Sequence, residues 1–491
     1  MAKKPSLYAL LGILRSSTQE EIRRAYLKAA KRLHPDTNNA PGETELFLDI
    51  QQAYQVLSEP SRRSAYDATL DPAEEELPAF VNQRILFSRK EIPRLTEAQL
   101  LYILLDLFPN NKIEETGAAP INVCLVLDCS TSMKGEKLDT AKATAIQLVH
   151  RLKPQDIFSM VSFSDRAEVI ISATRQSSLQ RFENRIQMLQ TSGGTEIFRG
   201  LQRGYEEVRR YASPRSINHI ILLTDGRTYG DEQACYTLAE QAAEEGIGIS
   251  GFGIGSGWND IFLDHLSTVT GGSSMFVSQP KDIERLINEK FSNLARTYAE
   301  NVTLEYQAQE GVEVSYIFRL QPESEALASQ NPISLGPVLQ DEPLSVLIEF
   351  RITPKREAGD TMTIVDGRLE ISSAIAPVPP APIRVNLTLP LKDEPAPDPP
   401  PIAIVQAISK LTLYRIQEKA RAEVAAGDYD KASTHLQKLA THLLAQGERN
   451  LAHTIMLEVE HIEQEKSFSE SGDKQIKYGT RALLLPGERR L

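Results

Sequence analysis

The stretch Ile121-Asn-Val-Cys-Leu-Val-Leu127, followed directly by Asp128-Cys-Ser-Thr-Ser132, decides the fold of the central part of the chain. Six of its first seven residues are apolar, which is typical of a strand buried on both faces of a sheet. An acid and the hydroxyls of Ser130 and Ser132 follow at the carboxyl end. In open α/β sheets, ligands bind at this end of the strands, and oxygen groups suit a hard cation such as Mg²⁺. The stretch therefore predicts a metal site at a sheet edge.

Length and charge limit the functions to consider. At 491 residues the chain is too long for one hydrophobic core, so we expect several domains. The net charge of −12 argues against nucleic-acid binding by the whole chain. Residues 1–70 differ from the rest, because 10 Lys and Arg stand there against 8 Asp and Glu. The basic character is therefore local.

The cysteines and apolar runs indicate a cytoplasmic protein. Cys124, Cys129 and Cys235 include no CxxC pair, so we expect neither a disulfide framework nor a zinc site. No small-residue cleavage site follows the apolar run 7–14, so we do not interpret it as a signal peptide. No run of 18 apolar residues occurs, so we expect no membrane span.

The pattern of residues 5–70 predicts a helical hairpin. A capping box, Ser17 with Glu20, starts the first helix. This helix ends before His34-Pro35-Asp36, because the residue before a proline is driven out of the helical region. A second amphipathic helix turns apolar residues from Phe47 to Leu57 inward. We expect the His-Pro-Asp tripeptide at the exposed tip of the hairpin.

This order of features resembles the J domain of DnaJ-type co-chaperones. The matching residues are Tyr8, Leu11-Gly12, Ala25-Tyr26, His34-Pro35-Asp36, Phe47, Ala53-Tyr54, Val56-Leu57, Arg63 and Tyr66-Asp67. The resemblance implies that the tripeptide and the basic face of the preceding helix bind a DnaK-type chaperone ATPase and stimulate its ATP hydrolysis. The residues with these implied roles are His34, Pro35, Asp36, Arg23, Arg24, Lys28 and Lys31. The alternative is a solvated basic helix whose loop merely contains the tripeptide.

Strands alternate with helical patterns over residues 118–294, which predicts a doubly wound, mostly parallel, Rossmann-like sheet. Asp225 directly follows the predicted strand 219–224, and Thr195 lies in a glycine-containing loop just before a predicted helix. Three loops at one edge of the sheet should therefore bring two carboxylates and three hydroxyls together.

This combination resembles the von Willebrand factor A (VWA) domain and its metal-ion-dependent adhesion site (MIDAS). The resemblance implies a protein partner that supplies an acidic residue to a bound Mg²⁺, with Mn²⁺ or Ca²⁺ as alternatives. The implied metal ligands are Asp128, Ser130, Ser132, Thr195 and Asp225. The alternative is that the serines only cap the next helix and hold no metal. We expect Cys129 and Trp258 to be packing residues, since a thiolate is too soft for Mg²⁺.

The remaining segments predict strands and then helices. The apolar run from Leu100 to Phe108 favours a buried strand, with a helix left open. From Asn301 the apolar pattern alternates with period two, which predicts a β-sandwich. Asp366-Gly367 predicts a hairpin turn within it. In the bacterial proteins that this part resembles, strands before the VWA domain complete the sandwich, which implies that Arg84 to Leu107 belong to it.

Beyond a proline-rich linker, helical patterns are interrupted at Gly427 and Gly447 and predict a small helical bundle. We expect the last 25 residues to be an extended tail. The predicted architecture is 5–70 J domain, 71–81 linker, 82–117 strands preceding the VWA domain, 118–294 VWA domain, 298–392 β-sandwich, 393–401 linker, 402–466 helical domain and 467–491 tail.

The sequence contains no Ser/His/Asp set, Walker loop or catalytic cysteine arrangement, so we expect no enzyme activity. The leading hypothesis is a co-chaperone that recruits a DnaK-type ATPase to a protein bound by the VWA domain through Mg²⁺. The rival hypothesis is an assembly scaffold whose J domain only docks a chaperone. A metal-dependent hydrolase is a third class, but no candidate base or nucleophile stands near Asp128.

Overall fold

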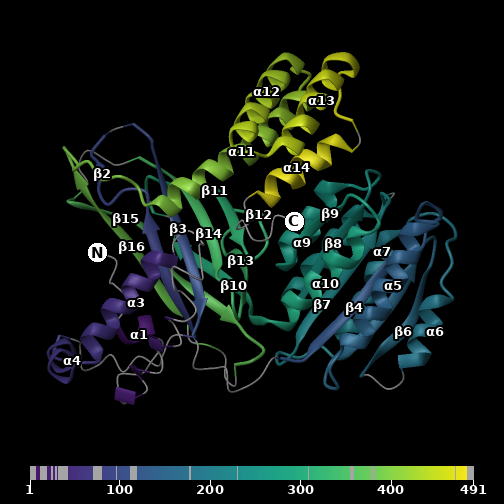
Figure 1. Cartoon of the computed structure of the whole chain (residues 1–491), viewed down its shortest axis with the longest axis horizontal. Coiled ribbons are helices and arrows are strands. Elements are labelled where there is room, and N and C mark those ends of the chain that lie inside the picture. The colour runs from purple at the N-terminus through teal and green to yellow at the C-terminus, as the bar shows by residue number, and fades with distance from the viewer. Residues whose placement is uncertain are drawn as a thin grey trace.

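The computed structural model shows an α/β body beside two β-sheets, with a helical body above their junction and short amino-terminal helices beside the sheets (Figure 1). The residues that the structure describes are 7–11, 19–20, 22–23, 26–27, 30, 43–69, 80–95, 97–110, 119–175, 179–228, 230–307, 309–353, 359–376, 380, 382–469 and 471–483.

The central domain is a six-stranded sheet in the order β6-β5-β4-β7-β8-β9. Its pairs are parallel except for β6, which runs antiparallel to β5. This topology confirms the predicted doubly wound, mostly parallel sheet. The strands are β4 (Ile121–Asp128), β5 (Ile157–Phe163), β6 (Ala167–Arg175), β7 (Ile217–Thr224), β8 (Ile247–Ile254) and β9 (Ser274–Val277).

Helices cover both faces of this sheet, which explains why β4 is apolar at almost every position. Val123, Leu125 and Leu127 pack in one cluster with α5, α6 and α10. Cys124 and Val126 pack in another with α7, α8 and α9. These helices are α5 (Glu136–Arg151), α6 (Leu179–Gln187), α7 (Ile197–Arg209), α8 (Glu232–Glu244), α9 (Asp260–Thr270) and α10 (Asp282–Ala295), and a short 3-10 helix, η2 (Thr131–Met133), precedes α5.

The two other sheets have five strands each, in the orders β1-β3-β14-β11-β12 and β13-β10-β15-β16-β2. Strand β3 confirms the strand predicted from the apolar run that starts at Leu100. Leu104 of β3 lies opposite both Leu86 of β1 and Leu347 of β14. Strands that precede the central domain therefore share a sheet with strands that follow it. The strands are β1 (Val81–Phe87), β2 (Ile92–Pro93), β3 (Gln99–Pro109), β10 (Thr297–Gln307), β11 (Val312–Gln321), β12 (Glu325–Ala326), β13 (Ile333–Leu339), β14 (Leu344–Ile352), β15 (Thr361–Ser372) and β16 (Ile383–Lys392).

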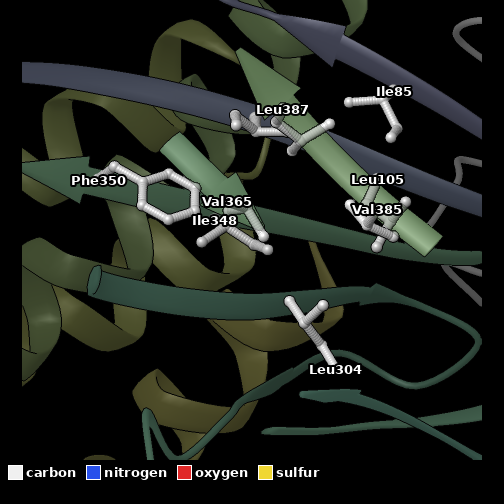
Figure 2. Close-up of a pocket in the computed structure, with 9 residues that line it drawn as sticks. Ile85, Leu105, Leu304, Ile348, Phe350, Val365, Val385 and Leu387 are labelled. Atoms are coloured by element: carbon white, nitrogen blue, oxygen red, sulfur yellow. The ribbon is translucent and has the colours of Figure 1, made fainter. Parts of the chain in front are cut away.

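The two five-stranded sheets share one apolar core. A cavity of about 10 Å³ within it is lined from both sheets, as Figure 2 shows, by Ile85, Ile103, Leu105, Leu304, Ile348, Phe350, Val365, Val385 and Leu387. All of these side chains are aliphatic or aromatic. A cavity of this size and lining offers a water no polar partner, so the core stays dry.

The hairpin turn predicted at Asp366-Gly367 is wrong. Strand β15 runs through both residues and pairs with β10 on one side and β16 on the other. A Cβ on Gly367 would lie 2.3 Å from the carbonyl oxygen of Glu305 in β10. The glycine therefore allows two backbones to approach closely within a strand, and it makes no turn.

The carboxy-terminal helices confirm the predicted interruptions. Gly427 and Gly447, both with positive φ, lie in the connections between successive helices, where glycine adopts a left-handed conformation at little cost. The helices are α11 (Ile402–Ala425), α12 (Tyr429–Ala445), α13 (Arg449–Glu465) and α14 (Gly472–Ala482).

The extended tail predicted from residue 467 is wrong for residues 472–482, which form α14. The buried face of this helix includes Lys474, Lys477 and Arg481. Because charged residues take the place of an apolar stripe, the hydrophobic period on which the prediction rests did not reveal the helix.

The amino-terminal helices are α1 (Leu7–Leu11), α3 (Glu43–Leu57) and α4 (Pro60–Asp67). Ile50, Ala53 and Leu57 are buried together with Tyr8, which confirms the inward face of the second predicted helix. Phe108 of β3 belongs to the same cluster, so these helices pack against the end of a sheet strand. Among the described residues, no helix has both the length and the apolar character needed to cross a bilayer.

Candidate metal site and chaperone-docking segment

Two predicted site residues come together because β4 and β7 are parallel neighbours. Leu127 of β4 lies opposite Leu223 of β7. Asp128 ends β4, and Asp225 follows the last residue of β7. Both acids therefore stand at the same carboxyl edge of the sheet, where ligands bind in folds of this class.

Asp128 is fully buried and is held from two sides. The hydroxyl of Thr224 donates to its Oδ2 at 2.6 Å, and the backbone N–H of Ser130 donates to its Oδ1 at 2.8 Å. Burial raises the pKa of Asp128 above its ordinary value, and these hydrogen bonds oppose the rise. The two hydrogen bonds thus hold the carboxyl group of Asp128 in place at the base of the cluster.

Two hydroxyls connect this loop to Asp225. Ser130 Oγ lies 2.9 Å from Ser132 Oγ, and the Ser132 hydroxyl donates to Asp225 Oδ1 at 2.6 Å. The ammonium of Lys137 donates to the other oxygen of Asp225, also at 2.6 Å. Ser130 and Asp225 are buried whereas Ser132 is exposed, so the cluster opens to solvent on one side.

The third loop, which contains Thr195, lies against the first two. The backbone N–H of Ser192 donates to the carbonyl oxygen of Cys129 at 2.8 Å. A Cβ on Gly226 would lie 2.9 Å from Thr195 Oγ1, so this hydroxyl stands directly beside the backbone that follows Asp225. Position 226 needs a glycine because a larger residue would displace Thr195.

Hydrogen bonds thus link four of the nominated ligands, Asp128, Ser130, Ser132 and Asp225, and the hydroxyl of Thr195 lies beside the Gly226 backbone that follows Asp225. The five nominated side chains offer two carboxylates and three hydroxyls, an all-oxygen set that fits a hard divalent ion keeping some of its waters. Among the described residues, no group of three or more His, Cys, Asp and Glu side chains could hold a metal. An ion at this cluster would therefore depend on the hydroxyls.

Cys129 and Trp258 are packing residues, as predicted. Cys129 lies in the core beneath the sheet edge, and burial raises its pKa to about 12, so its thiol does not ionise near neutral pH. Trp258 is 1% exposed and packs against Phe276 and Tyr478.

Sequence reasoning missed two members of the cluster, Thr224 and Lys137. Thr224 contacts Asp128, which lies 96 positions away in the sequence, and no local sequence pattern predicts this contact. Lys137 lies in the first turn of α5, where the helix dipole disfavours a cation, but this position does not identify Asp225, 88 positions away, as its partner.

The predicted chaperone-docking segment is described at one of its residues. Arg23 is helical and exposed. The other predicted docking residues lie outside the described residues: Arg24, Lys28, Lys31, His34, Pro35 and Asp36. Their roles stay predictions.

Three parts of the chain match models of known families. Residues 6–67 match the DnaJ domain, residues 122–289 the von Willebrand factor type A domain, and residues 402–486 the Sll0103-like, C-terminal alpha-helical domain.

Different relatives match different parts of the chain. An uncharacterized protein, sll0103 of Synechocystis sp., is 28% identical over 332 residues, which are 65% of this chain and 78% of the relative. Chaperone protein DnaJ 2 of Thermus thermophilus is 51% identical over 67 residues, which are 14% of this chain. This chain spans only about a quarter of the length of that DnaJ protein, 24%.

Two solved structures share the fold of most of the chain. A von Willebrand factor type A protein from Catenulispora acidiphila covers 82% of this chain with 96% of its own length, at a TM-score of 0.64 and 15% identity. The ArnB paralog VWA2 from Sulfolobus acidocaldarius covers 82% with 98% of its own length, at a TM-score of 0.50 and 17% identity.

Both the DnaJ-like and the VWA matches indicate a role in protein interaction. The protein carries an amino-terminal J domain similar to that of DnaJ co-chaperones, a central VWA domain of α/β fold and a carboxy-terminal helical domain of the Sll0103-like type.

Proposed function

We propose that this protein is a co-chaperone that brings a DnaK-type chaperone ATPase to a protein held by its VWA domain through a divalent ion. The observation that supports this most is the cluster of two carboxylates and three hydroxyls at the edge of the VWA sheet, on the same chain as a J domain. In this proposal the partner ATPase hydrolyses ATP, and the chain itself catalyses no reaction.

The ion would be Mg²⁺, with Mn²⁺ or Ca²⁺ as alternatives, held by Asp128, Ser130, Ser132, Thr195 and Asp225. A bound ion would offer a Lewis-acidic position to a carboxylate of the partner. The exposed Ser132 and the half-buried Thr195 border the open side of the cluster. We expect the acidic residue of the partner to approach from that side.

The J domain would act on the chaperone through His34, Pro35 and Asp36, with the exposed Arg23 and its basic neighbours steering the encounter. Because one chain carries both binding modules, the chaperone meets the captured protein at a raised local concentration without any new contact. We further propose that the two five-stranded sheets, which share one core, form the predicted β-sandwich that supports the VWA domain.

The decisive experiment measures ATP turnover by a DnaK-type chaperone in the presence of the full-length protein. We expect stimulation by the wild type and by Asp128→Asn, and loss of stimulation in His34→Gln. Asp128→Asn is the matched control, because it alters only the VWA domain. Equal turnover with wild type and His34→Gln would contradict the co-chaperone and favour the scaffold, in which the J domain only docks.

The proposed metal binding is tested by titrating the protein with Mn²⁺ in a calorimeter. Thr195→Val removes one hydroxyl with little change in shape, and losing one ligand should weaken binding by about tenfold, equivalent to ~1.4 kcal/mol. Thr237→Val, on the exposed surface of α8, should bind like the wild type. A wild type that binds no Mn²⁺ would remove ion-dependent capture from the proposal.

A further inference from the structure

Lys137 occupies an unusual electrostatic position. Its ammonium lies 2.6 Å from Asp225 Oδ2 and donates to the backbone carbonyl oxygen of Ser132 at 3.3 Å. The Asp225 side chain is 0% exposed and that of Lys137 is 33% exposed. The lysine therefore reaches inward from the surface to neutralise a buried carboxylate, although it lies at the helix end that repels cations.

The same contact places Lys137 where it must affect a bound ion. Asp225 offers Oδ1 to Ser132 and Oδ2 to Lys137, so both oxygens already have positively polarised partners. A divalent ion that uses this carboxylate must share it with the ammonium or displace the ammonium. The two positive charges repel each other at short range, where partial burial weakens screening by water.

We propose that Lys137 is an internal counter-cation of the site, which holds Asp225 in place when no divalent ion is bound and competes with the ion for that carboxylate. The competition sets the ion affinity of the site below what its oxygens alone would give. This inference rests on the proposed ion binding and adds its regulation by a residue of the chain.

The lysine also affects the choice of partner. Asp128 and Asp225 contribute two negative charges when ionised, and Lys137 contributes one positive charge. A divalent ion then leaves the group with a net charge of +1, whereas the group without the lysine would be neutral. With Lys137 kept beside the ion, the site attracts a carboxylate more strongly.

The test compares Lys137→Met with two controls. Methionine keeps most of the length of the side chain and removes the charge, while Lys137→Arg keeps a cation. Lys134→Met removes an exposed lysine of the same loop. Each full-length variant is titrated with Mn²⁺ in a calorimeter and melted in EDTA and in excess Mg²⁺.

Lys137→Met should bind Mn²⁺ about tenfold more tightly than the wild type, because the ion no longer competes with the ammonium. Its melting temperature in EDTA should fall, since the buried Asp225 loses its cation and keeps only the hydrogen bond from Ser132, and Mg²⁺ should raise it by more than in the wild type. Both controls should behave like the wild type. Adding Asp225→Asn to Lys137→Met should restore the melting temperature in EDTA, which keeps the pairing testable if the single variant folds poorly.

The outcomes separate this inference from the proposed function. If wild type and Lys137→Met bind Mn²⁺ equally well, the inference is overturned and ion binding stands. If the wild type binds no Mn²⁺ but Lys137→Met does, the counter-cation is supported and ion-dependent capture by the natural protein is refuted.

Discussion

Replacing Asp264 by asparagine should loosen helix α14 from the VWA domain. Asp264 lies on α9, and its Oδ2 is 2.7 Å from Lys477 Nζ and 2.7 Å from Arg481 Nη2. Both cations belong to α14 and are almost fully buried. Burial by itself raises the pKa of Asp264, but the charges of Arg481 and Lys477 outweigh it and hold the pKa well below its usual range.

The expected magnitude follows from this burial. Removing one member of a buried ion pair costs about 3–5 kcal/mol, because the remaining charge keeps its desolvation penalty. Asparagine can still accept one hydrogen bond, and Asp260 still pairs with Lys477, so we take the lower figure of about 3 kcal/mol. At ~1.4 kcal/mol per factor of ten, local opening of α14 becomes roughly a hundredfold more frequent.

Hydrogen exchange measures this opening directly, since global unfolding of several domains is not a two-state process. In Asp264→Asn the amides of residues 472–482 should exchange about a hundredfold faster, while those of β4 keep their wild-type rates. Glu313→Gln is the matched control, because it neutralises one member of an exposed ion pair with Arg351, which is worth less than about 1 kcal/mol. Exchange in α14 within about threefold of the wild type would refute the reasoning.

The pH dependence of this contact has a definite sign. The pKa of Asp264 is lowered in the folded state. Its stabilisation is therefore fully present above the pKa of an unfolded aspartate, about 3.9, and is lost as the pH falls toward the folded value. The α14 contact should consequently persist at mildly acidic pH.

The remaining predictions concern the metal site, a partly buried glutamate and two thiols. Gly226→Ala should push Thr195 out of place and weaken Mn²⁺ binding by about tenfold or more without unfolding the domain, as calorimetry and circular dichroism can show; unchanged affinity would contradict the placement of Thr195. Burial raises the pKa of Glu300 to about 7, so the wild type should lose up to about 3 kcal/mol of stability as the pH rises from about 4.5 through 7. Glu300→Gln should not show this loss, so its melting temperature should exceed that of the wild type at pH 8 but not at pH 5. If the melting temperatures of the two proteins change with pH in the same way, the raised pKa of Glu300 is refuted. Burial raises the pKa of Cys124 and of Cys129 to about 12, so neither should react with a thiol reagent until denaturant is added, and rapid labelling of the native protein would refute their burial.

Strands such as β4 were predictable from local patterns because burial of their side chains decides which residues they contain. An apolar residue at nearly every position of β4 indicates a strand covered on both faces, and Val123 and Cys124 do pack on opposite sides of the sheet. The hairpin turn at Asp366-Gly367 failed for the opposite reason. A glycine can serve a turn or a close backbone approach, and only the neighbouring strand β10 decides between them.

The candidate site was nominated from the sequence by residue type and by position after predicted strands. Convergence of Asp128 and Asp225 followed from one assumption, that the two strands are parallel, because parallel strands end at a common edge. The ion pair at the site could not be predicted from residue type and strand position. Lys137 and Asp225 are 88 positions apart, and no local pattern connects them.

The sequence by itself therefore determined the order of domains, the central strand and the set of oxygen-bearing side chains. Repeating apolar residues and short motifs record these features within a few neighbouring positions. The tertiary structure alone decided that Lys137 neutralises Asp225, that β3 completes a sheet with β14, and that α14 is held to the VWA domain by Asp264. The physical reason is that a buried charge or an open strand edge is satisfied by whichever group the fold brings near, however far away that group lies along the chain.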